Sequence, residues 1–393
     1  MKILTRYVVF DLIKVFLLIL TGLTLTIFIV LLGKQAVENG LGLGPLIRLT
    51  PYLLPEAMQF AVPGTMLLAT TYVYGRLSSY NEIVAIKSLG ISPMVLVWPT
   101  LILATLASFA GVYVNNLAVS WGKRGQDRVV IESVEDILYG QLKIRRTFSM
   151  GRFSTIVRRV EGRKLIQPTV VIEADGSGPP TTVRAKEAEI WFDSKERKLT
   201  VMAHDYEVSG PINVTDPGTW QQVMSYDDLM GNSSKTPSPS NLSLGEIPGA
   251  IEEGELRVEQ LRQSMTAQAS FAMLSGEFST LAEQNWKWRE KEIEGVQQRL
   301  HRLHLEPWRR WANGFSCLGF VLIGVPVAIW LRFSEFLATF FLCFAPILLV
   351  YYPMMVVSVS QAKDGTFPPE SVWVGNILLA IAGVMLLRRV NRH

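Results

Sequence analysis

Six long apolar runs constrain this chain more than any other feature of its sequence. A run of about 18 apolar residues is long enough for one α-helix to cross the hydrocarbon core of a bilayer. The runs are Val15–Leu32, Leu53–Tyr74, Met94–Val114, Trp311–Leu331, Phe336–Val357 and Val372–Leu387. With 49% hydrophobic residues, the chain has too much apolar sequence for a soluble protein that is 18% charged. We therefore predict an α-helical membrane protein with six transmembrane helices, three on each side of a large insertion.

The insertion is a long polar region, roughly Ala118–Pro307, between the third and fourth runs. From Phe153 onward, apolar residues alternate with charged or polar ones in short segments, as they do around Val183, Ile190 and Val201. Strict alternation is typical of half-buried strands, and several short strands at this spacing indicate a sandwich or a jelly roll. We expect a β-jelly-roll-like domain here.

The later part of the insertion changes character. Met230–Pro248 is rich in Ser, Pro, Asn and Gly and predicts a linker. Ile251–Leu305 is rich in Glu, Gln, Arg and Leu, contains no proline, and predicts one or two solvated helices. The expected division of the chain is transmembrane helices 1–3 in 1–117, the β-domain in 118–229, the linker and helical insertion in 230–307, and transmembrane helices 4–6 in 308–393.

Lysines and arginines orient the helices, because cytoplasmic segments of membrane proteins carry an excess of them. With the N-terminus inside, the inner segments hold Lys2, Arg6, Lys14, Arg76, Lys87, Arg332, Arg388, Arg389 and Arg392. The short outer loops hold Lys34, Arg48 and Lys363. Four further cations would lie close to the membrane on the outer side and count against this orientation: Lys123, Arg124, Arg309 and Arg310. We expect both termini and the segment Gly75–Pro93 inside, with the β-domain outside. The first run has no small-residue cleavage site behind it, so it is expected to be an anchor.

The polar interruption Gly75–Pro93 carries a dense set of local signals. Ser79 followed by Glu82 fits a capping box, which would start a short helix at Tyr80. Gly90 provides a left-handed exit after Leu89, and Ser92 with Pro93 then fits an N-cap and a first-turn proline. The sequence predicts a helix of under three turns, a bend and a new membrane helix. A helix this short is unstable by itself and needs a partner surface.

Signals for catalysis and cofactors are absent from the sequence. No P-loop, H-E-x-x-H or G-x-S-x-G pattern occurs, so we expect no nucleotide site and no catalytic residue in this chain. Cys317 and Cys343 fall in predicted membrane helices, and His301 and His304 lack a matching carboxylate, so no metal site and no cofactor are indicated. No basic stripe with interleaved aromatics supports nucleic-acid binding.

The segment Leu53–Pro93 contains a specific set of residues: Pro63, Gly75-Arg76-Leu77-Ser78, Asn81-Glu82, Ala85 and Gly90-Ile91-Ser92. With these residues it closely resembles the LptF/LptG permease family, the membrane subunits of the lipopolysaccharide-exporting ABC transporter. Further similarity lies in Arg309-Arg310, in Gly324-Val325-Pro326, and in Ser154–Val208, which is similar to the family's periplasmic jelly roll. The stretch Met230–Leu305 is longer than the family's usual connection.

This resemblance implies a role for the short inner helix and for one outer lysine. In the family, the helix docks into a groove of a cytoplasmic ATPase and its glutamate is important for coupling, a role that falls on Glu82. The implied coupling residues are Arg76, Leu77, Tyr80, Glu82, Ile83 and Gly90. Lys34 matches in position a basic residue that contacts the phosphorylated head of the lipid. Two alternatives remain open, namely that Glu82 serves only as a helix cap and that Lys34 only extends to lipid head groups at the membrane surface.

The resemblance also implies partners and location. The implied partners are an LptB-like ATPase dimer, a second LptF/LptG-like permease subunit, an LptC/LptA-like periplasmic bridge and the lipid substrate. The implied location is the bacterial inner membrane, with the large domain in the periplasm. The chain would itself be a non-catalytic transporter subunit. Two other functions fit the residues: a MacB- or FtsX-like mechanotransmitting permease, and a membrane-anchored scaffold or signalling protein whose outer domain binds a ligand. A lipid-modifying enzyme has less support.

Overall fold

The fold comes from a computed structural model that describes residues 2–39, 41–150, 153–172, 181–193, 196, 198–209, 214–225, 237–276, 283–331 and 336–392. The chain forms two compact units. The helical unit comprises Met1–Ile27, Pro55–Ser120 and Pro239–His393, and the sheet unit comprises Phe28–Leu54 and Trp121–Ser238. Of the segment expected to be a linker, Met230–Pro248, residues 230–236 lie outside the described residues. The described part contains a 3₁₀ turn at Pro239–Asn241 and the start of a helix at Ile247.

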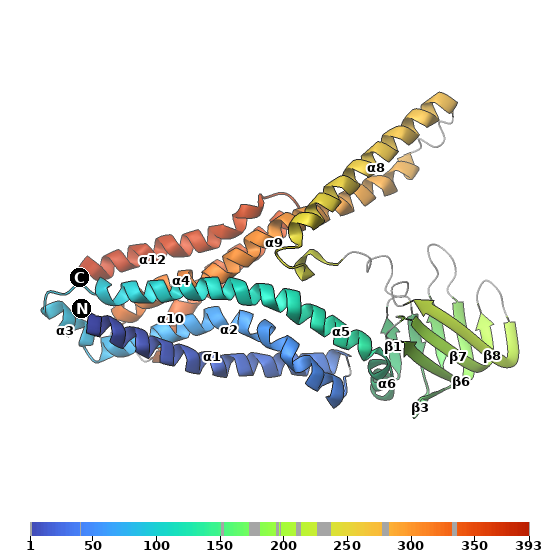
Figure 1. Ribbon diagram of the computed structural model, residues 1–393, viewed down its shortest axis with the longest axis horizontal. Helices are drawn as coiled ribbons and strands as arrows, with labels where there is room; N and C mark the ends of the chain where they lie inside the picture. Colours follow the sequence, from blue (N-terminus) through green and yellow to red (C-terminus); the bar gives the residue numbers. More distant parts are fainter. Residues whose placement is uncertain are drawn as a thin grey trace. The chain divides into compact units, whose positions relative to one another are not determined.

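The helical unit is a bundle of helices of very different lengths. They are α1 (Lys2–Asn39), α2 (Leu43–Ser79), α3 (Glu82–Ser88), α4 (Met94–Leu117), α8 (Ile247–Ser275), α9 (Glu283–Trp330), α10 (Phe336–Pro346), α11 (Tyr352–Lys363) and α12 (Val374–Arg392), of which α1 and α2 extend into the sheet unit. Short π- and 3₁₀-segments join some of them: η1 (Ala118–Lys123), η3 (Pro239–Asn241), η5 (Ile347–Tyr351) and η6 (Pro369–Trp373). Figure 1 shows α3 at the same end of the bundle as both chain termini.

Five helical stretches among the described residues are long and apolar enough to cross a membrane. They are Ile3–Val37, Met94–Glu132, Arg289–Trp330, Phe336–Lys363 and Pro369–Val390. Helix α2, which contains the second apolar run, Leu53–Tyr74, is not among them, so the count of six transmembrane helices remains a prediction.

Helix α2 holds polar side chains within the bundle. Its threonines Thr65, Thr70 and Thr71 are fully buried inside the bundle. The hydroxyl of Thr70 donates to the carbonyl of Met66 at 2.8 Å, and that of Thr71 donates to the carbonyl of Leu67 at 2.9 Å. A helix that faces protein rather than lipid can carry such groups, because hydroxyls such as those of Thr70 and Thr71 find a backbone acceptor one turn away. The hydroxyl of Thr65 has no hydrogen-bond partner within the described residues.

Small residues let α4 and α9 approach closely. A Cβ on Gly314 of α9 would lie 2.3 Å from Val112 Cγ2 and 2.9 Å from the Val112 backbone nitrogen on α4. A Cβ added to Gly111 of α4 would in turn lie 3.6 Å from the Cα of Gly314. Small residues at crossings of membrane helices allow tight backbone packing of this kind. The position of α9 in the bundle therefore depends on Gly314.

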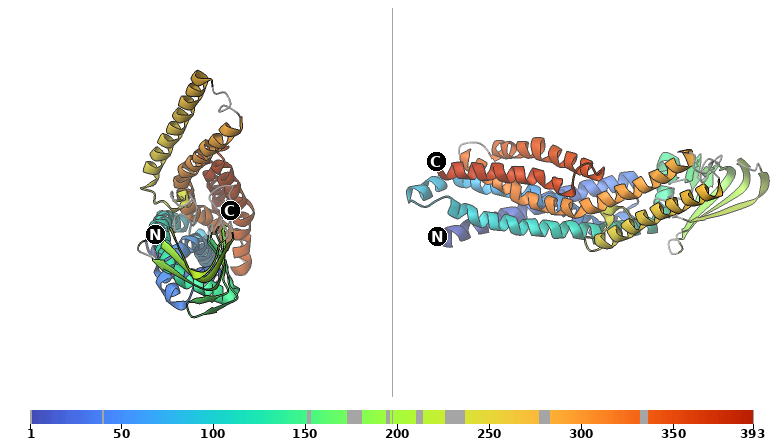
Figure 2. Two further views of the ribbon diagram at one scale, coloured as in Figure 1. Left: turned by 90° about the vertical axis from the view of Figure 1, so that its right-hand side faces the viewer. Right: turned by 90° about the horizontal axis from the view of Figure 1, so that it is seen from above.

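Helices α8 and the first half of α9 form a hairpin that projects from the bundle (Figures 1 and 2). The segment predicted to be helical, Ile251–Leu305, falls within this hairpin. Gly254 of α8 lies against Leu300 of α9, where a Cβ would come within 2.7 Å of the leucine side chain. Because α9 continues without a break into the bundle, the hairpin is an extension of a bundle helix.

The sheet unit contains two helices, α5 (Arg124–Glu132) and α6 (Val134–Arg145), and one antiparallel sheet. Its strands are β1 (Thr147–Met150), β2 (Phe153–Ile156), β3 (Arg159–Glu161), β4 (Lys164–Ile166), β5 (Thr169–Ile172), β6 (Thr181–Asp193), β7 (Lys198–Ser209) and β8 (Val214–Ser225). The order is β1-β2-β5-β6-β4-β3, with β7 between β6 and β8. This curled sheet agrees with the alternation in the sequence, whereas a jelly roll remains a prediction.

The core of the sheet unit forms where α6 packs on the sheet. Ile190 of β6 pairs with Val201 of β7, and both are buried. The hydroxyl of Tyr139 on α6 donates to the carbonyl of Arg163 at 2.7 Å and receives the amide N–H of Ile190 at 3.2 Å. Burial raises the pKa of Tyr139 above its ordinary value, since the charged form would lose its hydration. The tyrosine thus joins α6 to two separate parts of the sheet.

Candidate functional site

The connection between α2 and α4, Gly75–Pro93, begins differently from the sequence prediction. Helix α2 continues to Ser79, and the Ser79 hydroxyl donates back to the carbonyl of Gly75 at 2.9 Å. The short helix α3 begins at Glu82 after Asn81, whose φ of 59° is left-handed and whose side chain makes no capping bond. The capping box between Ser79 and Glu82 is therefore wrong, as is the helix start at Tyr80. Asn adopts left-handed backbone more readily than most residues, so it can end one helix and begin the next.

The end of the connection agrees in part with the sequence prediction. Gly90 has a φ of 75°, and its amide donates to the carbonyl of Lys87 at 2.9 Å. The Ser92 hydroxyl receives the amide N–H of Met94 at 3.3 Å at the start of α4. The left-handed glycine is confirmed, whereas the N-cap of α4 is Pro93 and not Ser92 as predicted.

The surface at α3 and beside it is partly apolar and exposed. Val84 of α3 is exposed, as are Tyr80 just before the helix, at 71%, and Leu89 just after it, at 75%. Ile83 is buried, and Leu77 at the end of α2 is buried with it in the bundle core. Since Leu77 and Ile83 offer no surface to a partner, any part they have in coupling goes through packing.

Glu82 and Arg76 have different surroundings. The half-buried carboxylate of Glu82 has no hydrogen bond or ion pair within the described part of the chain. The guanidinium of Arg76 instead forms an ion pair with Asp11 of α1, with 2.7 Å between Nη2 and Oδ2. Of the two charged residues assigned to coupling, Glu82 is the one whose charge is available to a partner.

Three polar contacts tie the connection to three bundle helices. Besides the ion pair of Arg76 with α1, the Ser78 hydroxyl donates to the carbonyl of Ile329 on α9 at 3.0 Å. The ammonium of Lys87 donates to the carbonyl of Val390 at the end of α12 at 3.1 Å. Of the three, only the Lys87 contact comes from α3 itself, so α3 is tied directly to the end of α12, whereas Arg76 and Ser78 tie the end of α2 to α1 and α9.

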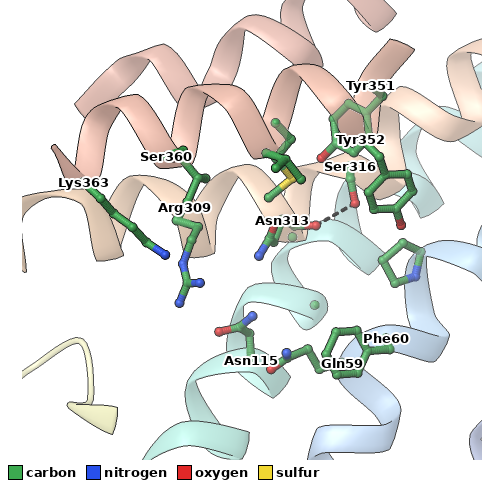
Figure 3. Close-up of a pocket in the computed structure, with 16 residues that line it drawn as sticks. Gln59, Phe60, Asn115, Arg309, Asn313, Ser316, Tyr351, Tyr352, Ser360 and Lys363 are labelled. Atoms are coloured by element: carbon green, nitrogen blue, oxygen red, sulfur yellow. Dashed lines mark hydrogen bonds between the residues drawn. The ribbon is translucent and has the colours of Figure 1, made fainter. Parts of the chain in front are cut away.

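A second candidate site is a cavity of about 580 Å³ in the helical unit, called the α9 pocket below (Figure 3). Its walls come from α2, α4, α9, the π-segment η5 and α11. The lining residues are Gln59, Phe60, Pro63, Gly111, Asn115, Arg309, Asn313, Gly314, Ser316, Tyr351, Tyr352, Met355, Val356, Val359, Ser360 and Lys363. The volume lies in the range of small-molecule sites, and the lining is largely apolar with a few polar groups.

Two cations, Arg309 and Lys363, line this pocket and extend toward the same part of it in Figure 3. Arg309 pairs with Glu306 one turn earlier on α9, with 2.8 Å between Nη2 and Oε2. Lys363 has no ion pair within the described residues. One carboxylate beside two cations leaves this side of the pocket positively charged, which suits an anionic group.

The neighbouring Arg310 has a structural role instead. Its side chain is 1% exposed, and Nη2 donates to the carbonyl of Leu242 at 2.7 Å. Glu306, also buried, receives the Ser240 hydroxyl at 3.2 Å and lies 3.5 Å from Arg310 Nε. These contacts hold the chain that precedes α8 against α9. Of the adjacent pair, Arg309 faces the pocket and Arg310 anchors the hairpin.

Lys34, the lipid contact implied by the resemblance, lies on the part of α1 that belongs to the sheet unit, and its side chain is exposed. Its proposed lipid contact stays a prediction.

Sequence reasoning missed most of the α9 pocket. Lys363 entered the sequence argument only as a positive charge in an outer loop, and Asn115 and Asn313 did not enter it. A signal was present in the spacing of Arg309, Asn313 and Ser316, which lie three or four residues apart and so share one helix face. In the part of the chain that the structure describes, no group of three or more His, Cys, Asp or Glu residues is placed to hold a metal ion.

Comparison with known families adds one finding. The sequence model of the lipopolysaccharide export system permease LptF/LptG matches residues 6–389, nearly the whole chain. A search among curated proteins found no match.

Proposed function

We propose a function from one premise: the chain belongs to the LptF/LptG family of lipopolysaccharide export permeases. Members of this family are transporter permease subunits and generally not catalysts. Beyond that premise, we propose that this chain helps extract lipopolysaccharide or a related lipid from the inner membrane and passes it to a periplasmic bridge protein. A separate cytoplasmic ATPase, LptB-like and dimeric, supplies the energy, and a second LptF/LptG-like subunit completes the membrane part.

The observation that carries the proposal is the geometry of α3. The helix exposes Val84, and Tyr80 before it and Leu89 after it are exposed as well. The carboxylate of Glu82 has no partner within the described residues. Exposed apolar side chains beside one charge suit a groove in another protein, where their burial provides affinity and the charge fixes the position of the helix in the groove. The polar ties of the connection to α1, α9 and α12 give a route from that surface into the bundle.

The physics of lipid extraction supports a transporter of this design. Each methylene of an acyl chain costs about 0.8 kcal/mol to expose to water, so a lipid with several chains would cost tens of kcal/mol. The lipid must therefore pass from the bilayer into another apolar container. We propose that six transmembrane helices, α2 included, and a periplasmic jelly-roll domain provide successive containers, within the domain boundaries predicted from the sequence.

The α9 pocket has a proposed part in this path. Its apolar walls and its cations Arg309 and Lys363 fit an anionic lipid head whose chains remain in the bilayer. Lys34 is proposed as a further contact to the phosphorylated head. A mechanotransmitting permease, the main alternative, predicts a small, dry helix bundle, and the pocket of about 580 Å³ therefore favours transport.

The test is the substitution Glu82→Lys in the full chain, co-expressed with candidate ATPase partners. We expect the variant to lose co-purification with the ATPase and ATP-driven lipid release, because a cation would replace the carboxylate in the groove. Glu370→Lys is the matched control, since it makes the same charge change at an exposed glutamate that lies on η6 rather than on α3. Retained binding and release in the Glu82 variant would remove the coupling role of α3.

A further inference from the structure

A second, smaller cavity lies between the C-terminal ends of α9 and α12. Its volume is about 320 Å³, and it shares no lining residue with the α9 pocket. It is lined by Pro326, Val327, Trp330, Leu386, Arg389 and Val390. The walls are mainly apolar, and Arg389 is the charged residue among them.

The position of the cavity relative to the candidate membrane spans identifies its surroundings. Trp330 is the last residue of the span Arg289–Trp330, and Val390 is the last residue of the span Pro369–Val390. The cavity therefore opens where hydrocarbon gives way to lipid head groups. Trp330 is 68% exposed, and tryptophan is enriched at this boundary because its ring is apolar and its N–H is polar.

The charge at the cavity fits a phosphate. Arg389 is exposed and has no ion pair within the described residues. The planar guanidinium presents several donors in a geometry that suits phosphate oxygens. Basic pockets between membrane helices at this depth are typical binding sites for acidic lipid head groups.

We propose that this cavity is a binding site for an anionic glycerophospholipid, with part of one acyl chain against Val327 and Leu386 and the phosphate on Arg389. The small volume argues against a lipid with many chains as its occupant. The site is thus distinct from the transport path, and its occupancy does not depend on an ATPase.

A bound lipid would also affect α3. Val390, which lines the cavity, accepts the hydrogen bond from Lys87 of α3 through its carbonyl. A lipid that steadies the end of α12 would steady this contact as well. This consequence for coupling rests on the proposed function, whereas lipid binding itself does not.

The experiment uses the purified full chain in nanodiscs that contain phosphatidylcholine and a trace of phosphatidylglycerol with a photoreactive acyl chain. We expect crosslinks in the peptides that contain Val327 to Trp330 and Leu386 to Val390. Arg389→Gln should lower this labelling about fivefold, the loss expected for one basic contact to an anionic lipid at a membrane surface. Arg388→Gln is the matched control, because Arg388 is the exposed neighbour on the same helix and does not line the cavity.

Competition separates a lipid from a free anion. Unlabelled phosphatidylglycerol should displace the probe, whereas inorganic phosphate at millimolar concentration should leave labelling unchanged; displacement by phosphate would refute a lipid site. Val327→Trp, which fills the cavity while leaving Arg389 in place, should abolish the labelling in protein that still elutes as a single species. Equal labelling of the Arg388 and Arg389 variants, or crosslinks spread evenly over the lipid-facing helices, would overturn the proposal.

Discussion

The buried ion pair between Glu306 and Arg310 gives the strongest prediction for stability. Glu306 is 2% exposed and Arg310 is 1% exposed, and Nη1 of Arg310 has no hydrogen-bond partner within the described residues. Glu306→Gln keeps the shape and an acceptor for the Ser240 hydroxyl but removes the negative charge. Arg310 would then be a buried cation without a counter-charge. Removing one partner of a buried pair costs about 3–5 kcal/mol, so we expect destabilisation at the lower end of that range.

The measurement is thermal unfolding of the full chain in detergent, followed by the loss of the monodisperse peak. At about 2–4 °C per kcal/mol, the expected fall in the midpoint is roughly 10 °C. Glu187→Gln is the control, because Glu187 pairs with Lys164 at 3.1 Å on the exposed sheet surface, where such pairs contribute less than about 1 kcal/mol. The double variant Glu306→Leu with Arg310→Met should recover much of the loss. Equal midpoints for the Glu306 and Glu187 variants would refute the argument from buried charge.

Two further predictions concern packing and pH. Gly314→Val should destabilise the bundle by about 1–3 kcal/mol, since its Cβ would meet the backbone of Val112; an unchanged unfolding midpoint would contradict the close approach of α4 and α9. Tyr139→Phe should cost about 1–3 kcal/mol, because it leaves the amide of Ile190 and the carbonyl of Arg163 unpaired. The raised pKa of Tyr139 means that its contribution is present below about pH 10 and is lost as pH rises through the folded-state pKa. Between pH 9 and 11, wild-type stability should fall more steeply than that of Tyr139→Phe, and parallel pH profiles would contradict this.

Tertiary packing explains why the start of α3 was predicted wrongly. The capping box between Ser79 and Glu82 is a local pattern, and locally it is a good one. In the fold, Leu77 is buried and the Ser78 hydroxyl binds the carbonyl of Ile329. These contacts keep α2 helical through Ser79, so the bend moves to Asn81. Contacts from distant parts of the chain outweighed a preference of about 1 kcal/mol.

The sequence by itself determined the features that depend on covalent geometry and on the solvent. Apolar runs indicated the five candidate membrane-spanning helices found among the described residues, because the bilayer sets the length of such helices. Gly90 was left-handed because few other residues tolerate that backbone, and alternation indicated the strands. Tertiary structure alone decided what each polar side chain faces. Arg309 and Arg310 are adjacent and chemically identical, yet about 100° of helix rotation puts one in a pocket and the other in a buried ion pair. That difference is fixed by which helices surround α9, and no local pattern contains it.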